Sequence, residues 1–360
     1  MTLHVPDEWR SHLDDIAANP GVVVVVGDSD VGKTTFCTIM ACHGLEAGVS
    51  TAIVDGDIGQ SEIGPPTTIG LGLVDSPIQA MSELHPRALY FVGSTSPVGL
   101  LLATATGDKR LTEAAEALGR KLVIVDTTGL VRGVIGRRLK THKIELLRPR
   151  HIVALQRAGE AEHFLRFFDT SAGCTVHRLS PSRDVHPKSQ GLRAQRRAVR
   201  FQEYFRDAQV HDMPLEHIAT SGTWLKTGNP LEPKYLKFAE RALGTTAYHG
   251  EMVDKGVFLV TGSITPSREK VGIAELQEHF KTRSINIVPA SRFANLIVGL
   301  LDSRLDVLSL GIIRGIDFRS GVVSVSTPVR SVTPVTSVRF GILRLRPNGT
   351  EIVRLRPGDV

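Results

Sequence analysis

The stretch VVVVVGDSDVGKTTF, residues 22–36, places a glycine-rich loop between an apolar run and a helical pattern. Five consecutive valines predict a strand buried on both faces, as in a parallel sheet covered by helices. The glycines and the closing Gly-Lys-Thr match the spacing of a phosphate-binding P-loop, in the strand-loop-helix context that this motif requires. In such a loop the backbone amides surround a phosphate at the positive end of a helix. The stretch therefore predicts an α/β P-loop fold with a nucleoside triphosphate site.

The residues of this loop are candidates for nucleotide binding. Lys33 is expected to bridge the β- and γ-phosphates of ATP, and the Thr34 hydroxyl is expected to coordinate Mg²⁺. The complete loop comprises Gly27, Asp28, Ser29, Asp30, Val31, Gly32, Lys33, Thr34 and Thr35. A glycine-rich turn that binds nothing is the alternative, and the complete spacing argues against it.

Outward from this loop, short apolar runs alternate with helical patterns, which predicts a parallel sheet with helices on both faces. The runs are Val22–Val26, Thr51–Val54, Ala88–Val92, Leu122–Val125, Ile152–Leu155 and Thr175–Leu179. We expect a short helical segment at 1–20 and a P-loop domain at 21–245, with a basic helix near 188–205. Strand patterns broken by Gly and Pro predict a smaller β-rich C-terminal domain at 250–360.

The composition limits the class of protein. The 360 residues suffice for about two domains, and the net charge of +6 fits a polyanionic partner, although charge alone is weak support. Three cysteines without a ligand spacing favour a reducing compartment, and the 13 histidines show no HxxxH pattern, which predicts structural roles for them. No apolar run reaches the ~18 residues of a membrane span, and the acidic N-terminus is unlike a signal peptide. We therefore expect a soluble, cytoplasmic protein without a membrane partner.

The sequence DGDIGQSEIGPP, residues 55–66, places two carboxylates after the second apolar run. Open α/β sheets bind ligands at this edge, and strand alternation would point Asp55 and Asp57 the same way. The pair is therefore predicted to share one Mg²⁺ and one attacking group, although either could be a helix cap or a turn former. Gln60 lies in the stiff loop that follows and is a candidate for substrate binding.

Four motifs in order, GDSDVGKTT, DGDIGQSEIGPPTTIGLG, FVGSTSP and DTTGLVRG, resemble those of the polynucleotide 5′-hydroxyl kinases. This family includes the RNA kinase subunit of the eukaryotic pre-mRNA cleavage machinery, a pre-ribosomal RNA-processing kinase and shorter archaeal enzymes. The similarity covers about 15–360 and extends to NLIVGLLDSRLDVLSLGIIRGIDF. The resemblance implies transfer of the γ-phosphate of ATP, with Mg²⁺, to the 5′-hydroxyl end of a nucleic acid, with RNA favoured over DNA and the choice between them left open.

The resemblance also implies roles for single residues. Asp57 matches the carboxylate proposed to activate the 5′-hydroxyl, and Thr95 matches a residue that contacts the substrate end. The segment 126–133 matches a clasp that holds the terminal nucleotide, with Thr127, Thr128, Gly129 and Leu130 as substrate-binding candidates. The family often carries Trp where this chain has Leu130, so a stacking surface worth about 1–3 kcal/mol is absent here.

The basic helix carries arginines at i, i+3, i+4 and i+7, which share one face. They are Arg193, Arg196, Arg197 and Arg200. The resemblance makes this helix a lid over the transferring phosphate, with Arg193 and Lys188 as catalytic candidates and Arg197 as a substrate contact. Lys188 stands where the family usually has Arg, which keeps the charge and loses the bidentate fork. A solvated basic face is the alternative.

A second basic cluster follows the clasp and is expected to track a nucleic-acid backbone, unless it is ordinary surface charge. It comprises Arg132, Arg137, Arg138, Lys140, Lys143, Arg148 and Arg150.

Two other functions fit part of the sequence. Asp126-x-x-Gly129 would suit a regulatory GTPase or maturation NTPase, but an N/T-K-x-D guanine-reading motif is missing. Leu130 and Lys188 would suit a non-catalytic ATP-binding scaffold of an RNA-processing complex, although the retained Lys33 and Asp57 argue against lost chemistry.

Overall fold

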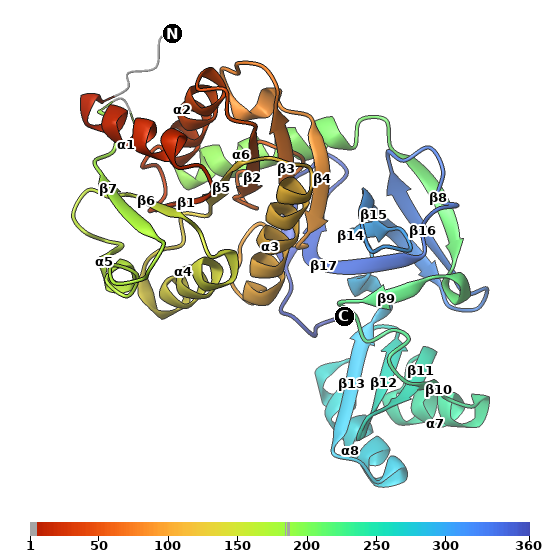
Figure 1. Cartoon of the computed structure of the whole chain (residues 1–360). Coiled ribbons are helices and arrows are strands. Elements are labelled where there is room, and N and C mark those ends of the chain that lie inside the picture. Colours follow the sequence, from red (N-terminus) through yellow and green to blue (C-terminus); the bar gives the residue numbers. More distant parts are fainter. Residues whose placement is uncertain (1–5, 184, 186–187) are drawn as a thin grey trace. The chain divides into compact units, whose positions relative to one another are not determined.

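The computed structural model describes residues 6–183, 185 and 188–360, and it divides into two compact units, Met1–Phe201 and Gln202–Val360 (Figure 1). The sequence placed this boundary between 245 and 250. The structure moves it to Phe201 because the segment after it supplies strands to the second unit. The first of these, β8 (Gln209–Pro214), pairs along its whole length with β16 (Val322–Thr327).

The first unit is built on a seven-stranded sheet in the order β4-β3-β2-β5-β1-β6-β7. Its strands are β1 (Val22–Gly27), β2 (Thr51–Gly56), β3 (Thr68–Val74), β4 (Pro86–Phe91), β5 (Leu122–Thr127), β6 (His151–Leu155) and β7 (Thr175–Leu179). The strands from β2 to β7 in this order pair in parallel, whereas β3 is antiparallel to both of its neighbours. The predicted α/β class is therefore confirmed.

Strand β3 was missing from the prediction because TIGLGLV contains two glycines, which weaken a strand pattern. The packing explains one of them. A β-carbon on Gly70 would lie 1.9 Å from the carbonyl oxygen of Ile63. The glycine thus lets the loop after β2 lie directly against β3.

Helices cover both faces of this sheet (Figure 1). They are α1 (Asp7–Ala18), α2 (Lys33–Glu46), α3 (Leu101–Ala117), α4 (Gly133–Leu147) and α5 (Glu162–Leu165), with one 3₁₀ turn, η1 (Met81–Glu83). A further helix, α6 (Gln190–Tyr204), follows β7. The valines of β1 alternate between two cores. Val23 and Val25 pack with α1 and α2, whereas Val22, Val24 and Val26 pack with the opposite layer. Each buried valine contributes about 1.5–3 kcal/mol, which explains the uninterrupted run.

The second unit contains two sheets. A larger sheet follows the order β18-β17-β14-β15-β16-β8, with β9 (Ala219–Ser221) paired to β17, and a four-stranded sheet follows the order β10-β11-β12-β13. The remaining elements are η2 (Leu215–His217), β10 (Asn229–Pro230), α7 (Pro233–Leu243), β11 (Ala247–Val253), β12 (Gly256–Thr261), α8 (Pro266–Phe280), β13 (Ser284–Pro289), η3 (Ala290–Arg292), β14 (Leu296–Leu301), β15 (Val307–Asp317), β17 (Ser337–Leu345) and β18 (Glu351–Arg354). The prediction of a smaller β-rich C-terminal domain is confirmed.

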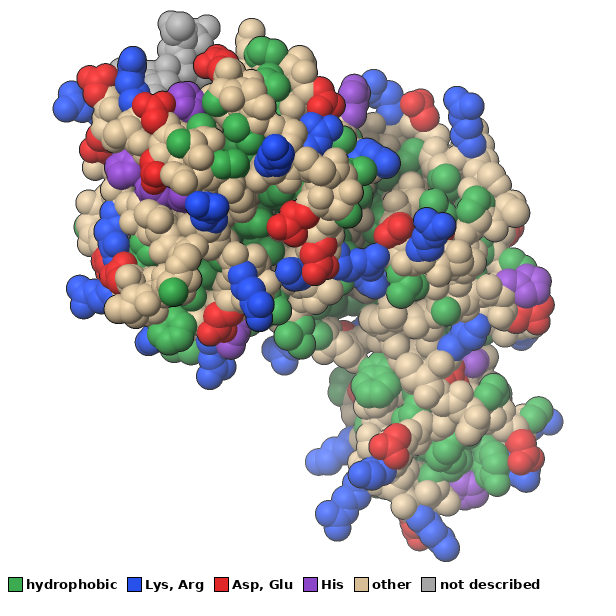
Figure 2. Space-filling model, viewed as in Figure 1, with side chains coloured by type: hydrophobic (Ala, Val, Ile, Leu, Met, Phe, Trp, Pro, Cys, Tyr) green, Lys and Arg blue, Asp and Glu red, His purple; other side chains and the backbone are tan. Residues whose placement is uncertain are grey.

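Two surface properties bear on partners. None of the described helices combines the length and apolar character needed to cross a bilayer. On the face of the first unit drawn in Figure 2, lysine and arginine side chains are interspersed with acidic ones.

Candidate active site

The P-loop connects β1 to α2 and adopts a backbone that its glycines permit. Gly32, the N-cap of α2, has φ 87°, and a β-carbon on Gly27 would lie 2.4 Å from the carbonyl oxygen of Leu155. The Lys33 side chain is buried and its Nζ donates to the carbonyl of Asp28 at 2.8 Å. The glycines and the Lys33 contact therefore define the conformation of the loop.

A cleft of about 430 Å³ opens above this loop, within the first unit. It gathers residues from the four motifs and from the predicted lid helix, and none from the second basic cluster. From the predicted set it is lined by Ser29, Asp30, Gly32, Lys33, Thr34, Thr35, Asp57, Gln60, Thr95, Thr128, Gly129, Leu130, Lys188, Arg193 and Arg197. Gly59, Ser96, Pro97 and Val185 complete the lining. From the predicted set, Gly27, Asp28, Val31, Asp55 and Thr127 do not line it.

Asp57 follows directly after the last residue of β2 and lines the cleft. Its Oδ1 accepts hydrogen bonds from the backbone amides of Gly59 and Gln60, at 3.1 and 3.2 Å. Among the described residues, no hydrogen bond reaches its Oδ2. The carboxylate is thus fixed through one oxygen while the other is available to a ligand in the cleft.

The contacts of Asp55 do not fit the expectation that it shares a metal ion with Asp57. Its Oδ2 accepts from the amides of Glu62 at 2.6 Å and Ile63 at 2.9 Å, and its Oδ1 accepts from the amide of Asp57 at 3.1 Å. Strand β2 ends at Gly56, so the alternation that was to align the two aspartates does not continue to Asp57. Asp55 shapes the loop that presents Asp57. Burial, followed by the nearby Asp126, raises the pKa of Asp55 well above its usual value.

Asp126 at the end of β5 is the acidic residue whose site role the sequence analysis missed. Its Oδ2 accepts the Thr34 hydroxyl at 2.7 Å, and its side chain is buried. Burial raises its pKa to about 6, with Lys33 and Thr34 opposing this shift and Asp57 adding to it. The sequence signal for this role was the Asp-Thr that follows the apolar run Leu122–Val125. It points to the site because β5 lies next to β1, the strand that leads into the P-loop.

The predicted lid helix contacts the P-loop. Arg193 Nη2 pairs with Asp30 Oδ2 at 2.5 Å, and the backbone amide of Lys188 donates to the same oxygen at 2.9 Å. Although burial raises the pKa of Asp30, these two contacts lower it overall. Arg200 is directed elsewhere, because its guanidinium donates to the carbonyls of Ser61 and Glu62 and so anchors the helix to the loop after β2.

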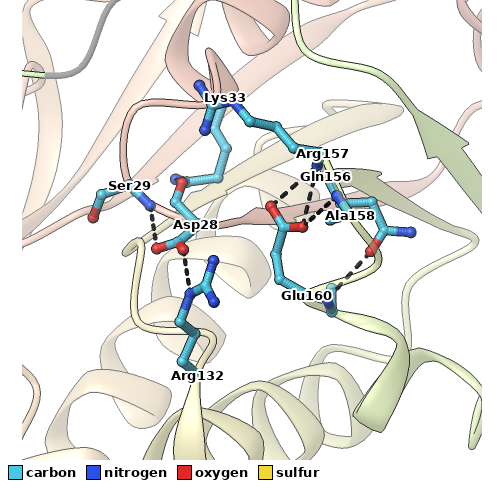
Figure 3. Close-up of polar contacts among 9 residues, drawn as sticks. Asp28, Ser29, Lys33, Arg132, Gln156, Arg157, Ala158 and Glu160 are labelled. Atoms are coloured by element: carbon cyan, nitrogen blue, oxygen red, sulfur yellow. Dashed lines mark hydrogen bonds and ion pairs between the residues drawn. The ribbon is translucent and has the colours of Figure 1, made fainter.

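The other flank of the P-loop is also held by arginines (Figure 3). Arg132 Nε pairs with Asp28 Oδ2 at 2.6 Å, and Arg157 Nη2 donates to the carbonyl of Asp30 at 2.7 Å. Glu160 accepts from the amides of Arg157 and Ala158, which fixes the turn after β6. Arg132 therefore supports the loop.

The clasp segment rests on a buried charged cluster. Lys140 Nζ donates to Thr127 Oγ1 at 2.7 Å and to the carbonyl of Thr128 at 2.6 Å, while Lys143 pairs with Asp108 of α3. Burial, followed by the neighbouring Lys143, holds the pKa of Lys140 well below its usual value. The expectation that Lys140 and Lys143 face a nucleic acid is wrong, because both are fully buried.

The rest of the second basic cluster is at the surface. Arg137, Arg138, Arg148 and Arg150 are exposed, and Arg150 donates to the side chain of Asn19 at 3.3 Å. Only Arg137 and Arg138 lie on the first half of α4, directly after the clasp. The exposed basic surface near the cleft is thus narrower than the sequence suggested.

Comparisons with known proteins identify the family of this chain. The model of the family "mRNA cleavage and polyadenylation factor CLP1 P-loop" matches residues 27–207. The polyribonucleotide 5′-hydroxyl-kinase of Thermococcus kodakarensis is 32% identical over 361 residues, covering 100% of this chain and 98% of the relative. The enzyme of the same name from Pyrococcus furiosus is 32% identical over 98% of this chain and 96% of its own length.

Solved structures give the same fold at lower identity. A chain in the wild-type Clp1p–Pcf11p complex aligns with a TM-score of 0.58 and 14% identity, over 94% of this chain and 78% of that one. At this identity the likeness concerns the fold. Sequence and fold together show that the chain belongs to the CLP1 P-loop family, alongside the polyribonucleotide 5′-hydroxyl-kinases of Thermococcus kodakarensis and Pyrococcus furiosus.

Proposed function

We propose that this protein is an ATP-dependent polyribonucleotide 5′-hydroxyl kinase. The single observation that carries the proposal is the cleft in which Lys33 and Thr34 of the P-loop, Asp57 and the lid residue Arg193 line one space. Full-length relatives named for this activity support the choice of RNA as substrate. The test is transfer of the γ-phosphate of ATP to an RNA that ends in a 5′-hydroxyl.

Mg²⁺ is the cofactor that the donor set fits. Asp126 Oδ1 is buried without a hydrogen-bond partner among the described residues, and the Thr34 hydroxyl and the Asp57 carboxylate provide further oxygen donors nearby. Hard cations such as Mg²⁺ prefer such oxygens. Thr34, Asp57 and Asp126 would hold the ion, directly or through water. When bound, it neutralises charge on the β- and γ-phosphates.

Side chains of the protein supply the general base, the phosphate contact and the substrate contacts. Asp57 accepts the proton of the 5′-hydroxyl while the hydroxyl oxygen attacks the γ-phosphorus, and the bond from that phosphorus to the β–γ bridging oxygen breaks to release ADP. A carboxylate fixed through one oxygen can hold the hydroxyl with the other. Lys33 leaves its contact with Asp28 to stabilise the oxygens between the β- and γ-phosphates. Thr95, Gln60 and the clasp residues line the part of the cleft where the terminal nucleotide would lie.

Arg193 is proposed to stabilise the charge that spreads over the transferring phosphoryl group. We expect Arg193→Ala to lower kcat by about one to two orders of magnitude and to change KM for ATP little, because the contact strengthens in the transition state. Steady-state kinetics with RNA and ATP measure this split. Lys188→Arg, which restores a bidentate fork, is expected to be neutral or mildly activating.

Arg196→Ala is the matched control for this prediction, since Arg196 is exposed on the same helix and does not line the cleft. Its kinetics should resemble those of the wild type. If Arg193→Ala keeps the wild-type kcat, the lid helix takes no part in phosphoryl transfer. The helix is then an RNA-binding or solvated surface.

The exposed pair Arg137 and Arg138 is proposed to contact the RNA backbone. Replacing both with alanine should weaken binding to all RNA sequences alike and flatten the salt dependence by up to about two units of slope, because two phosphate contacts are lost. RNA binding measured across a salt series tests this.

A matched control removes the exposed charges of Arg87 and Lys121. Arg87 lies at the start of β4 and Lys121 directly before β5, at the sheet edge opposite the cleft. This double variant should keep the wild-type slope. An unchanged slope in the Arg137 and Arg138 variant would assign those residues to ordinary surface charge.

A cytoplasmic location is also proposed. All three cysteines are free thiols, with Cys37 buried in the core and Cys42 and Cys174 partly covered. Unpaired cysteines are typical of a reducing compartment.

A further inference from the structure

Three histidines and an aspartate converge where α1 meets the edge of the sheet formed by β6 and β7. His151 begins β6, and His177 of β7 pairs with Val153, so the two histidines project from the same face of the sheet. Both imidazoles are buried, whereas Asp15 of α1 is exposed. Figure 2 shows histidine and acidic side chains reaching the surface over α1 and β7.

The ligand atoms are close to the spacing of a metal site. His177 Nε2 lies 3.0 Å from His151 Nδ1 and 3.9 Å from Asp15 Oδ2, and all three ligand atoms lie within 4.8 Å of one another. Tetrahedral ligands at 2.0–2.1 Å from zinc are about 3.3 Å apart. Reaching that spacing requires a movement of up to about 1.5 Å. The exposed Asp15 side chain, whose Oδ1 accepts from Asn19 Nδ2 at 3.0 Å, would supply most of it.

The second ring nitrogens already have the partners that metal-bound histidines use. His151 Nε2 lies 2.8 Å from the carbonyl oxygen of Asn19, which can only accept, so this nitrogen carries the proton and Nδ1 has a lone pair. His177 Nδ1 lies 2.9 Å from His12 Nδ1 and can donate to it. In the tautomer in which His177 Nδ1 donates to His12, His177 Nε2 has a lone pair as well. Such contacts fix the tautomer and orientation of metal ligands.

We propose that Asp15, His151 and His177 form a Zn²⁺ site, separate from the catalytic cleft, that fastens α1 to the sheet. Two imidazoles and one carboxylate suit zinc, with water completing the coordination on the solvent side of Asp15. None of these residues lines the catalytic cleft.

The site would stabilise the helix that backs the P-loop. Trp9 of α1 stands edge-on to Phe36 of α2 at 5.2 Å, and its Nε1 donates to the carbonyl of Ser180 at 3.0 Å. Glu8 of α1 accepts from the amide of Ser180 at 2.9 Å. Fixing α1 therefore steadies α2, which begins at Lys33.

The experiment uses the full-length protein without ATP or Mg²⁺. Metal is removed with a chelator, the protein is supplied with Zn²⁺ and gel-filtered, and bound zinc is measured by mass spectrometry of the metal. We expect one zinc per chain and a higher melting temperature than for the metal-free protein. Asp15→Asn and His151→Gln should each weaken zinc affinity by about 10- to 100-fold and abolish the thermal shift.

Two controls make the result specific. Asp14→Asn removes the neighbouring carboxylate on α1, which pairs with His43 at 2.9 Å, and should retain zinc. Asp57→Asn tests whether zinc occupies the catalytic cleft and should also retain it. The proposal is overturned if the wild type keeps no zinc, if Asp15→Asn binds as well as Asp14→Asn, or if zinc is lost from Asp57→Asn.

Discussion

Asp57→Asn is expected to reduce phosphoryl transfer by about 10²-fold or more while ATP binding stays nearly intact. The carboxylate faces the cleft and is held through Oδ1 by the amides of Gly59 and Gln60, contacts that an Asn side chain can keep through its oxygen. What the substitution removes is the capacity to accept the proton of the 5′-hydroxyl, and a lost general base costs on this scale. Single-turnover rates and calorimetric ATP binding separate the two quantities.

Asp55→Asn provides the comparison, because Asp55 shapes the loop and does not line the cleft. It should lower the melting temperature more than Asp57→Asn does, since a donating amide would face the backbone N–H groups that now meet a carboxylate oxygen. Equal transfer rates in Asp57→Asn and the wild type would contradict the assignment. Asp126, hydrogen-bonded to Thr34, would then be the next residue to test.

Lys33→Ala is expected to lower transfer by about 10³-fold, which is the largest effect of a single substitution in this protein. Its buried ammonium group donates to the P-loop carbonyl of Asp28, and we propose that it exchanges this contact for the phosphate oxygens on which charge develops. Alanine removes that charge, and no other described lysine or arginine belongs to the P-loop. End-labelling with γ-labelled ATP measures the loss.

The matched control is Lys109→Ala, which removes a lysine of α3 that pairs with Glu113 and does not line the cleft. Its transfer rate should equal that of the wild type. Substantial transfer by Lys33→Ala would contradict the role of Lys33 and point to Arg193 or Lys188 as the main phosphate cation.

The parts of the site that the sequence predicted are those encoded by contiguous residues. The P-loop and the Asp57 turn each form a local pattern whose neighbours along the chain are also its neighbours in space. The lid arginine, whose partner Asp30 is 163 positions away, was expected only from the resemblance to the kinase family. Asp126 escaped because its contact with Thr34 joins residues 92 positions apart. A strand order that places β5 beside β1 creates that contact.

The buried lysines show why charge alone misleads. Lys140 and Lys143 lie on the same face of α4 as Leu139 and Leu147, yet their charge suggested a surface role. Their partners, Asp108 on α3 and the end of β5, come from distant parts of the chain. Burying these lysines requires such partners, which a linear pattern does not reveal.

The proposed zinc ligands could not be predicted from the sequence for the same reason. Asp15, His151 and His177 have no characteristic spacing, because α1, β6 and β7 meet through the packing of a helix on a sheet.

The central claim is that ATP and a 5′-hydroxyl RNA end react in this cleft. The most direct measurement mixes the purified protein with Mg²⁺ and γ-labelled ATP, and supplies either a 5′-hydroxyl RNA or the same RNA carrying a 5′-phosphate. We predict that label enters only the 5′-hydroxyl RNA and that Asp57→Asn and Lys33→Ala abolish most of it. If the wild-type protein binds ATP but labels neither RNA, the protein is an ATP-binding scaffold and the account of its function is contradicted.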